Sequence, residues 1–91
     1  MVYDRDVMLK DLREMACEVH FKKVSTGDIR VMHASLRPDL LPTGVDTNYI
    51  KEQHEKEENK DIVVVWDLQK GGWRSFRVDS VIYFNALDNY D

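Results

Sequence analysis

Apolar and polar residues follow two different periods along this chain, and the change of period predicts one helix followed by strands. Between residues 4 and 16, apolar side chains recur every three or four positions, the spacing of an amphipathic helix. The stripe consists of Val7, Met8, Leu9, Leu12, Met15 and Ala16. Asp4 or Asp6 can cap the first turn, and the stripe predicts a helix laid over one end of a β-barrel.

From residue 17 the period becomes two, as in a half-buried strand. The alternating residues are Cys17, Val19 and Phe21 against Glu18, His20 and Lys22. Residues 25–28 include a glycine and supply a turn, and residues 29–36 return as a second strand. Residues 17–36 are therefore predicted to form a hairpin.

The position of this turn decides which side chains meet across the hairpin. With the turn centred on Thr26-Gly27, His20 lies opposite His33. The same register puts Lys22 opposite Val31, and a glycine bulge would shift both pairs by one residue.

Residues 37–60 break the strand pattern. The first eight contain two prolines and a glycine, and eight of the eleven residues 51–61 are charged. A helix beginning near Thr47 would be frayed, because Tyr49 and Ile50 have no apolar successor one turn later. We expect an exposed charged loop over 37–60, either a solvated excursion or a protein-docking segment.

Three further strands are predicted within residues 61–84. The β-branched run 62–66 is typical of a buried central strand, residues 73–78 alternate after a Gly-Gly turn, and residues 81–84 form a last short strand. Residues 85–91 read as an acidic tail. One N-terminal helix and five strands predict a mainly β protein, a small antiparallel sheet closed or nearly closed into a barrel.

Length and composition fit one soluble domain over residues 1–91. With 43% hydrophobic residues, the chain can bury one modest core. No apolar run reaches the length of a membrane span, and the first residues lack the pattern of a secretion signal, so no membrane partner is expected. A single cysteine, Cys17, excludes an internal disulfide. The net charge of −4 means that any nucleic-acid contact depends on a local basic patch.

Residues 64–81 carry an apolar strand, a turn and then Arg74-Ser75-Phe76-Arg77-Val78-Asp79. This order resembles the C-terminal half of WYL domains, with its Arg-x-Phe-Arg-apolar-Asp pattern. Residues 19–32 and 35–42 are similar to a compact WYL-like family found in tailed bacteriophages. The resemblance implies a five-stranded Sm-like, SH3-type small β-barrel, and a phage protein acting in the cytoplasm of the bacterial host.

The resemblance also implies a ligand face. WYL domains are ligand-sensing modules of bacterial regulators and defence-associated proteins, and basic and aromatic side chains on one barrel face are thought to contact nucleic acid or nucleotides. Arg74 and Arg77 match the arginines of the pattern, and Arg30 matches the arginine after the first hairpin turn. The Trp-Tyr-Leu tripeptide that names the family corresponds here to Asp61-Ile62-Val63.

Arg30, Arg74 and Arg77 are therefore the candidate ligand-binding residues, since arginine binds phosphate by planar, bidentate hydrogen bonds. We expect them to converge, with Lys22 beside them and Trp73 available to stack on a base. The alternative is that Arg74 and Arg77 pair with nearby carboxylates and only stabilise barrel edges.

Metal binding and catalysis are not expected. Cys17 points to the opposite face from His20, and His54 lies in the charged segment, so these residues and His33 do not form a zinc site. The chain has no Gly-rich phosphate loop and no nucleophile-base spacing. We therefore expect a protein that is not an enzyme and has no cofactor.

Three functional hypotheses follow. The first is a non-enzymatic phage accessory or regulatory protein that binds RNA, single-stranded DNA or a nucleotide through the arginine face. The second is a phage-encoded inhibitor or adaptor of a bacterial host or defence protein, suggested by the acidic balance and the charged residues 52–61. The third is a homo-oligomeric ring, suggested by exposed strand edges.

Overall fold

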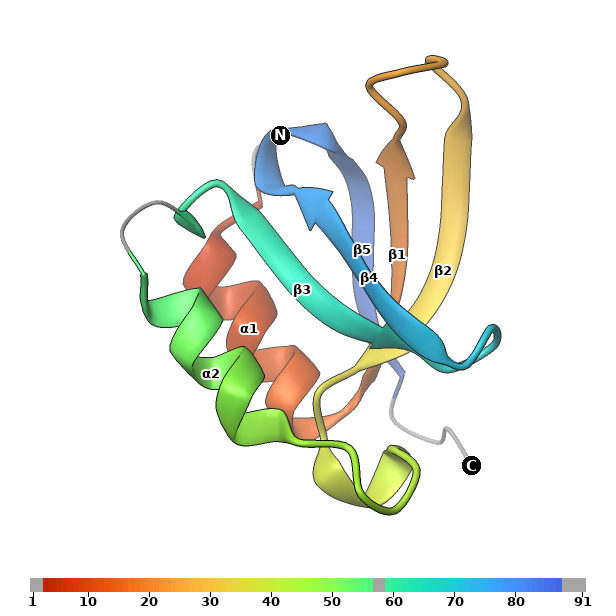
Figure 1. Cartoon of the computed structure of the whole chain (residues 1–91). Coiled ribbons are helices and arrows are strands. Elements are labelled where there is room, and N and C mark those ends of the chain that lie inside the picture. Colours follow the sequence, from red (N-terminus) through yellow and green to blue (C-terminus); the bar gives the residue numbers. More distant parts are fainter. Residues whose placement is uncertain (1–2, 57–58, 88–91) are drawn as a thin grey trace.

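The computed structural model describes residues 3–56 and 59–87, which form helices and one five-stranded antiparallel sheet (Figure 1). In chain order the elements are α1 (Arg5–Glu14), β1 (Ala16–Lys22), β2 (Ile29–Ser35), the 3-10 helix η1 (Pro38–Leu40), α2 (Thr47–Glu55), β3 (Ile62–Asp67), β4 (Gly72–Arg77), the 3-10 helix η3 (Val78–Ser80) and β5 (Val81–Leu87). The mainly β fold with an N-terminal helix is confirmed. Within the described ranges, no helix has the length and apolar character needed to cross a membrane.

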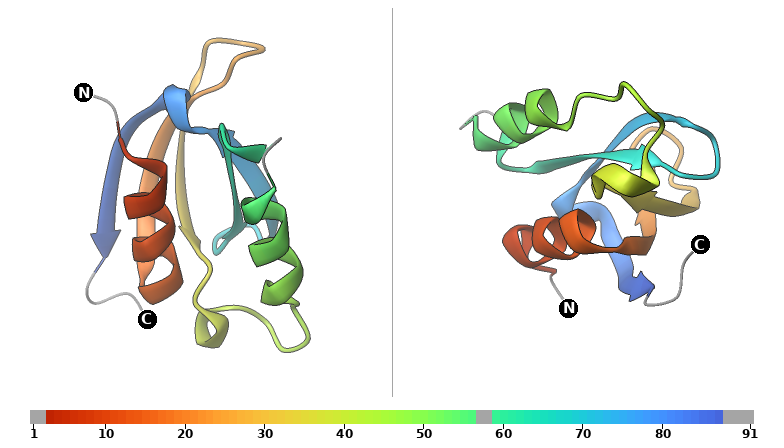
Figure 2. Two further views of the ribbon diagram at one scale, coloured as in Figure 1. Left: turned by 90° about the vertical axis from the view of Figure 1, so that its left-hand side faces the viewer. Right: turned by 90° about the horizontal axis from the view of Figure 1, so that it is seen from below.

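The sheet has the strand order β4-β3-β2-β1-β5 and is strongly bent (Figures 1 and 2). The pairs β1–β2 and β3–β4 are each aligned over six residue pairs. By contrast, β2 meets β3 only at Ala34–Asp67 and Ser35–Trp66. The β1–β2 hairpin and the β3–β4 hairpin therefore diverge from this short junction, and the core fills the space between them.

Helix α1 begins at the predicted aspartate and supplies a large share of the core. The Asp4 carboxylate accepts hydrogen bonds from the backbone N–H groups of Asp6 and Val7, at 2.8 and 3.3 Å. The buried core residues are Met8, Leu9, Leu12, Cys17, Val19, Met32, Ala34, Leu36, Ile50, Val63, Val65, Phe76 and Val81. Arg5 anchors the helix, because it donates to the backbone oxygens of Ile62 and His54, at 3.0 and 2.9 Å.

The hairpin register differs from the prediction by two residues. His20 lies opposite Val31, and Glu18 lies opposite His33. The cause is a longer turn: Lys23 N–H donates to the Asp28 carbonyl oxygen, and Gly27, at φ +78°, donates to the Lys23 carbonyl oxygen, both at 2.7 Å. A shift of two keeps every side chain on its predicted face, because the side-chain period of a strand is two.

The prediction of an exposed charged loop over residues 37–60 is wrong over Thr47–Glu55, because α2 forms there and packs on β3 (Figure 1). Residues 57–58 of this range lie outside the described residues. Ile50 and His54 on this helix are only 5% and 4% exposed. His54 Nε2 accepts a hydrogen bond of 2.8 Å from Val64 N–H, on the part of β3 that β2 does not reach. One turn after Ile50, the buried position of α2 is therefore occupied by His54. The sequence analysis had treated this histidine as a polar residue and found no apolar residue there.

The predicted tail over residues 85–91 is also partly wrong. Strand β5 continues to Leu87, and Asn85, Ala86 and Leu87 lie opposite Glu18, Cys17 and Ala16 of β1. Backbone pairing with β1 carries the strand beyond Phe84, where the prediction ended it. The rest of the predicted tail, residues 88–91, lies outside the described residues.

Candidate functional site

A hollow of about 290 Å³ lies between β2 and the β3–β4 turn. Three cationic side chains line it: Arg30 from β2, Lys70 from the turn and Arg74 from β4. The apolar side chains of Phe21 and Met32 line it as well. Arg30 and Arg74 therefore share a site, as predicted, together with a lysine that the sequence analysis did not single out.

One carboxylate, Asp67, lies in this hollow and is nearly buried. One of its oxygens, Oδ1, accepts from the backbone N–H groups of Gln69 and Lys70, both at 3.0 Å. Its other oxygen lies 3.5 Å from Arg74 Nε, well beyond the 2.7–2.9 Å typical of a charge-assisted hydrogen bond. Arg74 thus forms an ion pair with Asp67, as the alternative interpretation predicted, while Asp67 also holds the turn. Among the described residues, the Arg30 guanidinium has no hydrogen-bond or ion-pair partner.

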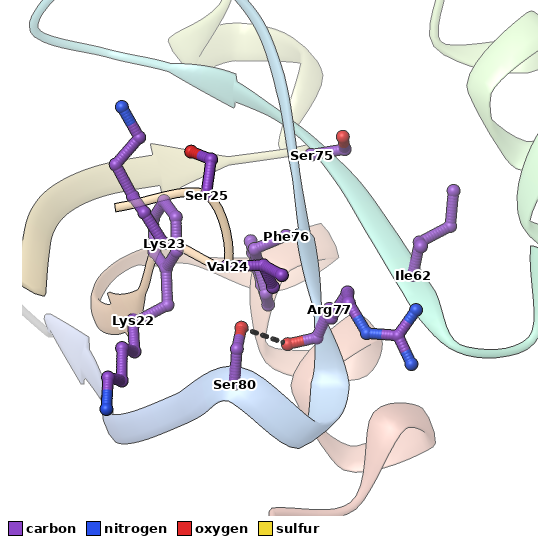
Figure 3. Close-up of a pocket in the computed structure, with 10 residues that line it drawn as sticks. Lys22, Lys23, Val24, Ser25, Ile62, Ser75, Phe76, Arg77 and Ser80 are labelled. Carbon is purple, nitrogen blue, oxygen red and sulfur yellow. Dashed lines mark hydrogen bonds between the residues drawn. The ribbon is translucent and has the colours of Figure 1, made fainter. Parts of the chain in front are cut away.

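A second hollow, of about 330 Å³, opens beside the β1–β2 loop (Figure 3). Phe76 and Val24 lie near its centre, and Lys22 and Lys23 extend outward from it (Figure 3). The rings of Phe21 and Phe76 stack with centroids 5.7 Å apart. Phe21 lines both hollows, so an aromatic side chain connects the two groups of cations.

Arg77 belongs to this second hollow, and the predicted convergence of three arginines is therefore wrong. The alternation of β4 puts Arg74 on the same face as buried Phe76 and puts Arg77 on the other face. Arg77 donates to both carboxylate oxygens of Asp79, at 3.1 and 3.2 Å. These hydrogen bonds lower the pKa of the Asp79 carboxyl group and raise that of the Arg77 guanidinium, so both groups stay charged and form an ion pair.

Trp73 does not join either hollow. It lies opposite Trp66 on the outer face of β3–β4, and the two rings meet edge to face with centroids 5.1 Å apart. Its side chain is 39% exposed. A stacking contact by Trp73 would therefore take place on the opposite face of β4 from Arg74.

The lining of the hollows is strongly cationic in an acidic protein. We call this surface the basic face; it consists of Lys22, Lys23, Arg30, Lys70, Arg74 and Arg77. Six of the 13 lysine and arginine residues line it, against two of the 13 acidic residues that the structure describes, Asp67 in the first hollow and Asp79 in a neighbouring third one. The other described residues include seven basic and 11 acidic side chains, so positive charge is concentrated at the hollows.

The two hairpin histidines do not face each other, because Glu18 lies between them. Its carboxylate oxygens lie 2.7 Å from His20 Nε2 and 3.2 Å from His33 Nε2. These hydrogen bonds lower the pKa of the Glu18 carboxyl group. Across residues 3–56 and 59–87, no group of three or more His, Cys, Asp or Glu residues is arranged to hold a metal ion.

Sequence reasoning missed Lys23, Lys70 and Phe21 as lining residues. Lys70 stands in a turn, and its approach to Arg30 depends on the junction between β2 and β3. Phe21 was expected only as a core residue of a strand. The sequence could have predicted Lys23 as a lining residue, because it directly follows the candidate Lys22 at the end of β1.

The bent five-stranded sheet, capped by an N-terminal helix and open at its basic face, defines a small barrel of the Sm-like, SH3 type. The chain belongs to the WYL_2 family, described as an Sm-like SH3 beta-barrel fold, which it matches over residues 5–82. A relative is the uncharacterized 11.5 kDa protein of the Gp31–cd intergenic region of enterobacteria phage T4. The two are 32% identical over 83 residues, which is 91% of this chain and 78% of the phage protein. No solved structure matches the chain.

Proposed function

We propose that this protein is a non-enzymatic phage accessory protein that binds single-stranded nucleic acid or a nucleotide on the basic face, in the cytoplasm of the bacterial host. The observation that carries the proposal is the hollow shared by Arg30, Lys70 and Arg74. Among the described residues one carboxylate lines this hollow, Asp67, and it also accepts from two N–H groups of the turn. Three cations against one carboxylate favour a phosphate-bearing ligand.

The second hollow supports an extended ligand. Lys22 and Lys23 lie on its rim, and the Phe21–Phe76 pair lies between its cations and those of the first hollow. Proteins that bind single strands combine cations along the backbone path with aromatic surfaces for the bases. A single strand fits this arrangement better than a duplex, because its bases are free to reach Phe21.

The test is a salt-dependent binding titration with mixed-sequence DNA and RNA oligonucleotides and with a nucleoside triphosphate. Three phosphate contacts give a log-log salt slope of about −2 for a single strand. Arg74→Ala and Lys70→Ala should each weaken binding and reduce the slope by about 0.7. Lys10→Ala, an exposed cation on α1, is the matched control and should leave both unchanged.

The three ligands separate the sources of the phosphate group. Binding of the triphosphate alone would identify a nucleotide site, and tighter binding of oligonucleotides would identify a strand. Equal behaviour of the Arg74 and Lys10 variants, or binding that does not depend on salt, would contradict the proposal.

A second candidate function is docking to a bacterial host or defence protein as an inhibitor or adaptor. The supporting observation is the outer face of β1, β2 and β5, where Ile29, Val31 and Tyr83 are exposed next to the Glu18–histidine cluster. The excess of acidic residues away from the basic face would favour a basic partner.

Affinity capture from bacterial lysate with and without nuclease distinguishes the two functions. A stoichiometric protein that survives nuclease and is lost with Val31→Ser supports docking, whereas capture that nuclease abolishes supports nucleic-acid binding.

A further inference from the structure

A separate cavity of about 160 Å³ lies between the end of α1 and the first half of α2. Arg13 lines it from the last turn of α1, and Thr47, Lys51 and His54 line it from α2. None of its lining residues contributes to the hollows of the basic face. The cavity is therefore a separate feature from the basic face.

The charges that line this cavity are all of one sign. Arg13 and Lys51 have no hydrogen-bond or ion-pair partner among the described side chains, and no acidic residue lines the cavity. Two cations that converge without a carboxylate repel each other and gain from an added anion.

His54 provides a second, independent observation. Its side chain is 4% exposed, and Nε2 accepts a hydrogen bond from Val64 N–H. The neutral ring therefore carries its hydrogen on Nδ1. This buried Nδ1 has no hydrogen-bond partner within residues 3–56 and 59–87. Buried donors are nearly always satisfied by protein, water or a bound group, so the unpartnered Nδ1 of a residue that lines the cavity provides a donor for a group bound there.

The electrostatics of His54 agree with an uncompensated cationic site. Burial, followed by the positive charges of Arg5 and Arg13, lowers the pKa of its imidazole to about 4. The imidazole is thus neutral at physiological pH, and Nδ1 is available as an uncharged hydrogen-bond donor.

We infer that the cavity between α1 and α2 binds a small oxyanion, held by Arg13 and Lys51 and completed by a hydrogen bond from His54 Nδ1. An engineered protein cavity of about 150 Å³ accepts benzene, with its six heavy atoms. A cavity of about 160 Å³ therefore fits a phosphate or a carboxylate group and excludes a nucleoside. The site holds either a free inorganic anion or an acidic side chain of a partner, which share this chemistry.

The experiment is an NMR titration of the full chain, labelled with ¹⁵N at the histidine rings, with sodium phosphate, sodium acetate and sodium chloride at equal ionic strength. Phosphate or acetate should shift and sharpen the His54 Nδ1–H signal in a saturable way, and chloride should not. A stronger response to phosphate identifies a free inorganic anion as the ligand, and a stronger response to acetate identifies a carboxylate group. A response equal to that of chloride, or no response, overturns the inference.

Variants on the exposed cations keep the fold intact and test the geometry. Arg13→Gln and Lys51→Gln should each weaken oxyanion binding by about tenfold or more, the usual effect of losing one charged hydrogen bond. Lys10→Gln and Lys56→Gln, exposed lysines of α1 and of the end of α2, are the matched controls and should bind as the wild type does. Equal weakening in all four variants would contradict a defined site. Arg74→Ala should leave the His54 response unchanged, so that failure of this inference is distinct from failure of the proposed function.

Discussion

Asp67 connects the local structure of the β3–β4 turn to the basic face. Its buried carboxylate holds two backbone N–H groups of the turn and approaches Arg74. The residue that shapes the turn therefore also helps to place Lys70 and Arg74 beside the first hollow.

We predict that Asp67→Ala lowers the free energy of unfolding by about 2 kcal/mol, because two backbone donors lose their acceptor. Asp67→Asn should lose less, since its amide oxygen still accepts from the turn. The measurement is urea unfolding followed by tryptophan fluorescence. Asp61→Ala, an exposed aspartate before β3, is the control and should stay within about 0.5 kcal/mol of the wild type. Equal losses at positions 67 and 61 would show that the turn does not depend on this carboxylate.

His54 predicts a loss of stability in mild acid. Its pKa of about 4 in the folded protein lies below the ordinary value of 6.5, so the unfolded chain binds more protons between these two pH values. Stability therefore falls as the pH falls from about 6.5 towards about 4. From pH 7 to pH 5, protonation of His54 in the unfolded chain should lower the free energy of unfolding by about 2 kcal/mol.

His54→Gln tests this prediction, because glutamine offers an acceptor to Val64 N–H and does not titrate. Unfolding free energies of both proteins at pH 7 and pH 5 should show a smaller loss for the variant than for the wild type. The comparison cancels the other titrating groups. The same loss in both proteins would mean that His54 is not held neutral by the fold.

Helix α2 packs against the part of β3 that does not pair with β2. Asp46 caps the helix by accepting from the N–H groups of Asn48 and Tyr49, and Ile50 inserts into the core. Charged residues cover the outside of this helix, and for that reason its sequence resembles an exposed loop.

We predict that Ile50→Ala costs about 2–4 kcal/mol of stability, the usual cost of truncating a buried isoleucine. Tyr49→Ala is the matched control, because Tyr49 is the neighbouring residue and is 58% exposed. It should change stability by less than about 0.5 kcal/mol. Chemical denaturation measures both variants, and two equally small effects would restore the exposed-loop interpretation of this segment.

At the scale of the whole molecule, positive charge gathers at the hollows of the basic face, while the other described residues carry more acidic than basic side chains. A chain with a net charge of −4 can therefore carry a local cluster of cations. The pI alone does not reveal such a cluster.

The reactivity of the Cys17 thiol provides a measure of global unfolding. It is fully buried between α1 and the sheet, and burial, with a smaller effect of Asp11, raises the pKa of its thiol to about 12. The native thiol should therefore be unreactive at neutral pH. We predict that labelling by a thiol reagent follows global unfolding and accelerates with urea in parallel with the fluorescence change. Labelling of the native protein at the rate of a small free thiol would contradict the packing of β1 against α1.

The local pattern of the chain was sufficient for α1 and for the faces of the strands, but it missed α2 and the end of β5. Apolar spacing located α1 and its Asp4 cap, and alternation assigned the inner and outer faces of β1 even though the register was displaced by two residues. These features depend on neighbours a few positions away, so a single sequence contains them. The family resemblance supplied the barrel type, which the family match over residues 5–82 confirms.

The composition of the candidate site depended on contacts between distant residues. Arg30 and Arg74 were predicted to converge and both line one hollow, but Lys70 lines it as well and Arg77 does not. Lys70 lines the hollow because β2 and β3 pair only at Ala34–Asp67 and Ser35–Trp66, so the two strands diverge beside the β3–β4 turn. Arg77 does not line it because side chains alternate along β4. The same departure of β2 leaves Val64 N–H without a strand partner and gives His54 its role. Periodicity encodes which face a side chain occupies, whereas only the packed chain decides which remote side chains share a hollow, because that depends on the bend of the sheet.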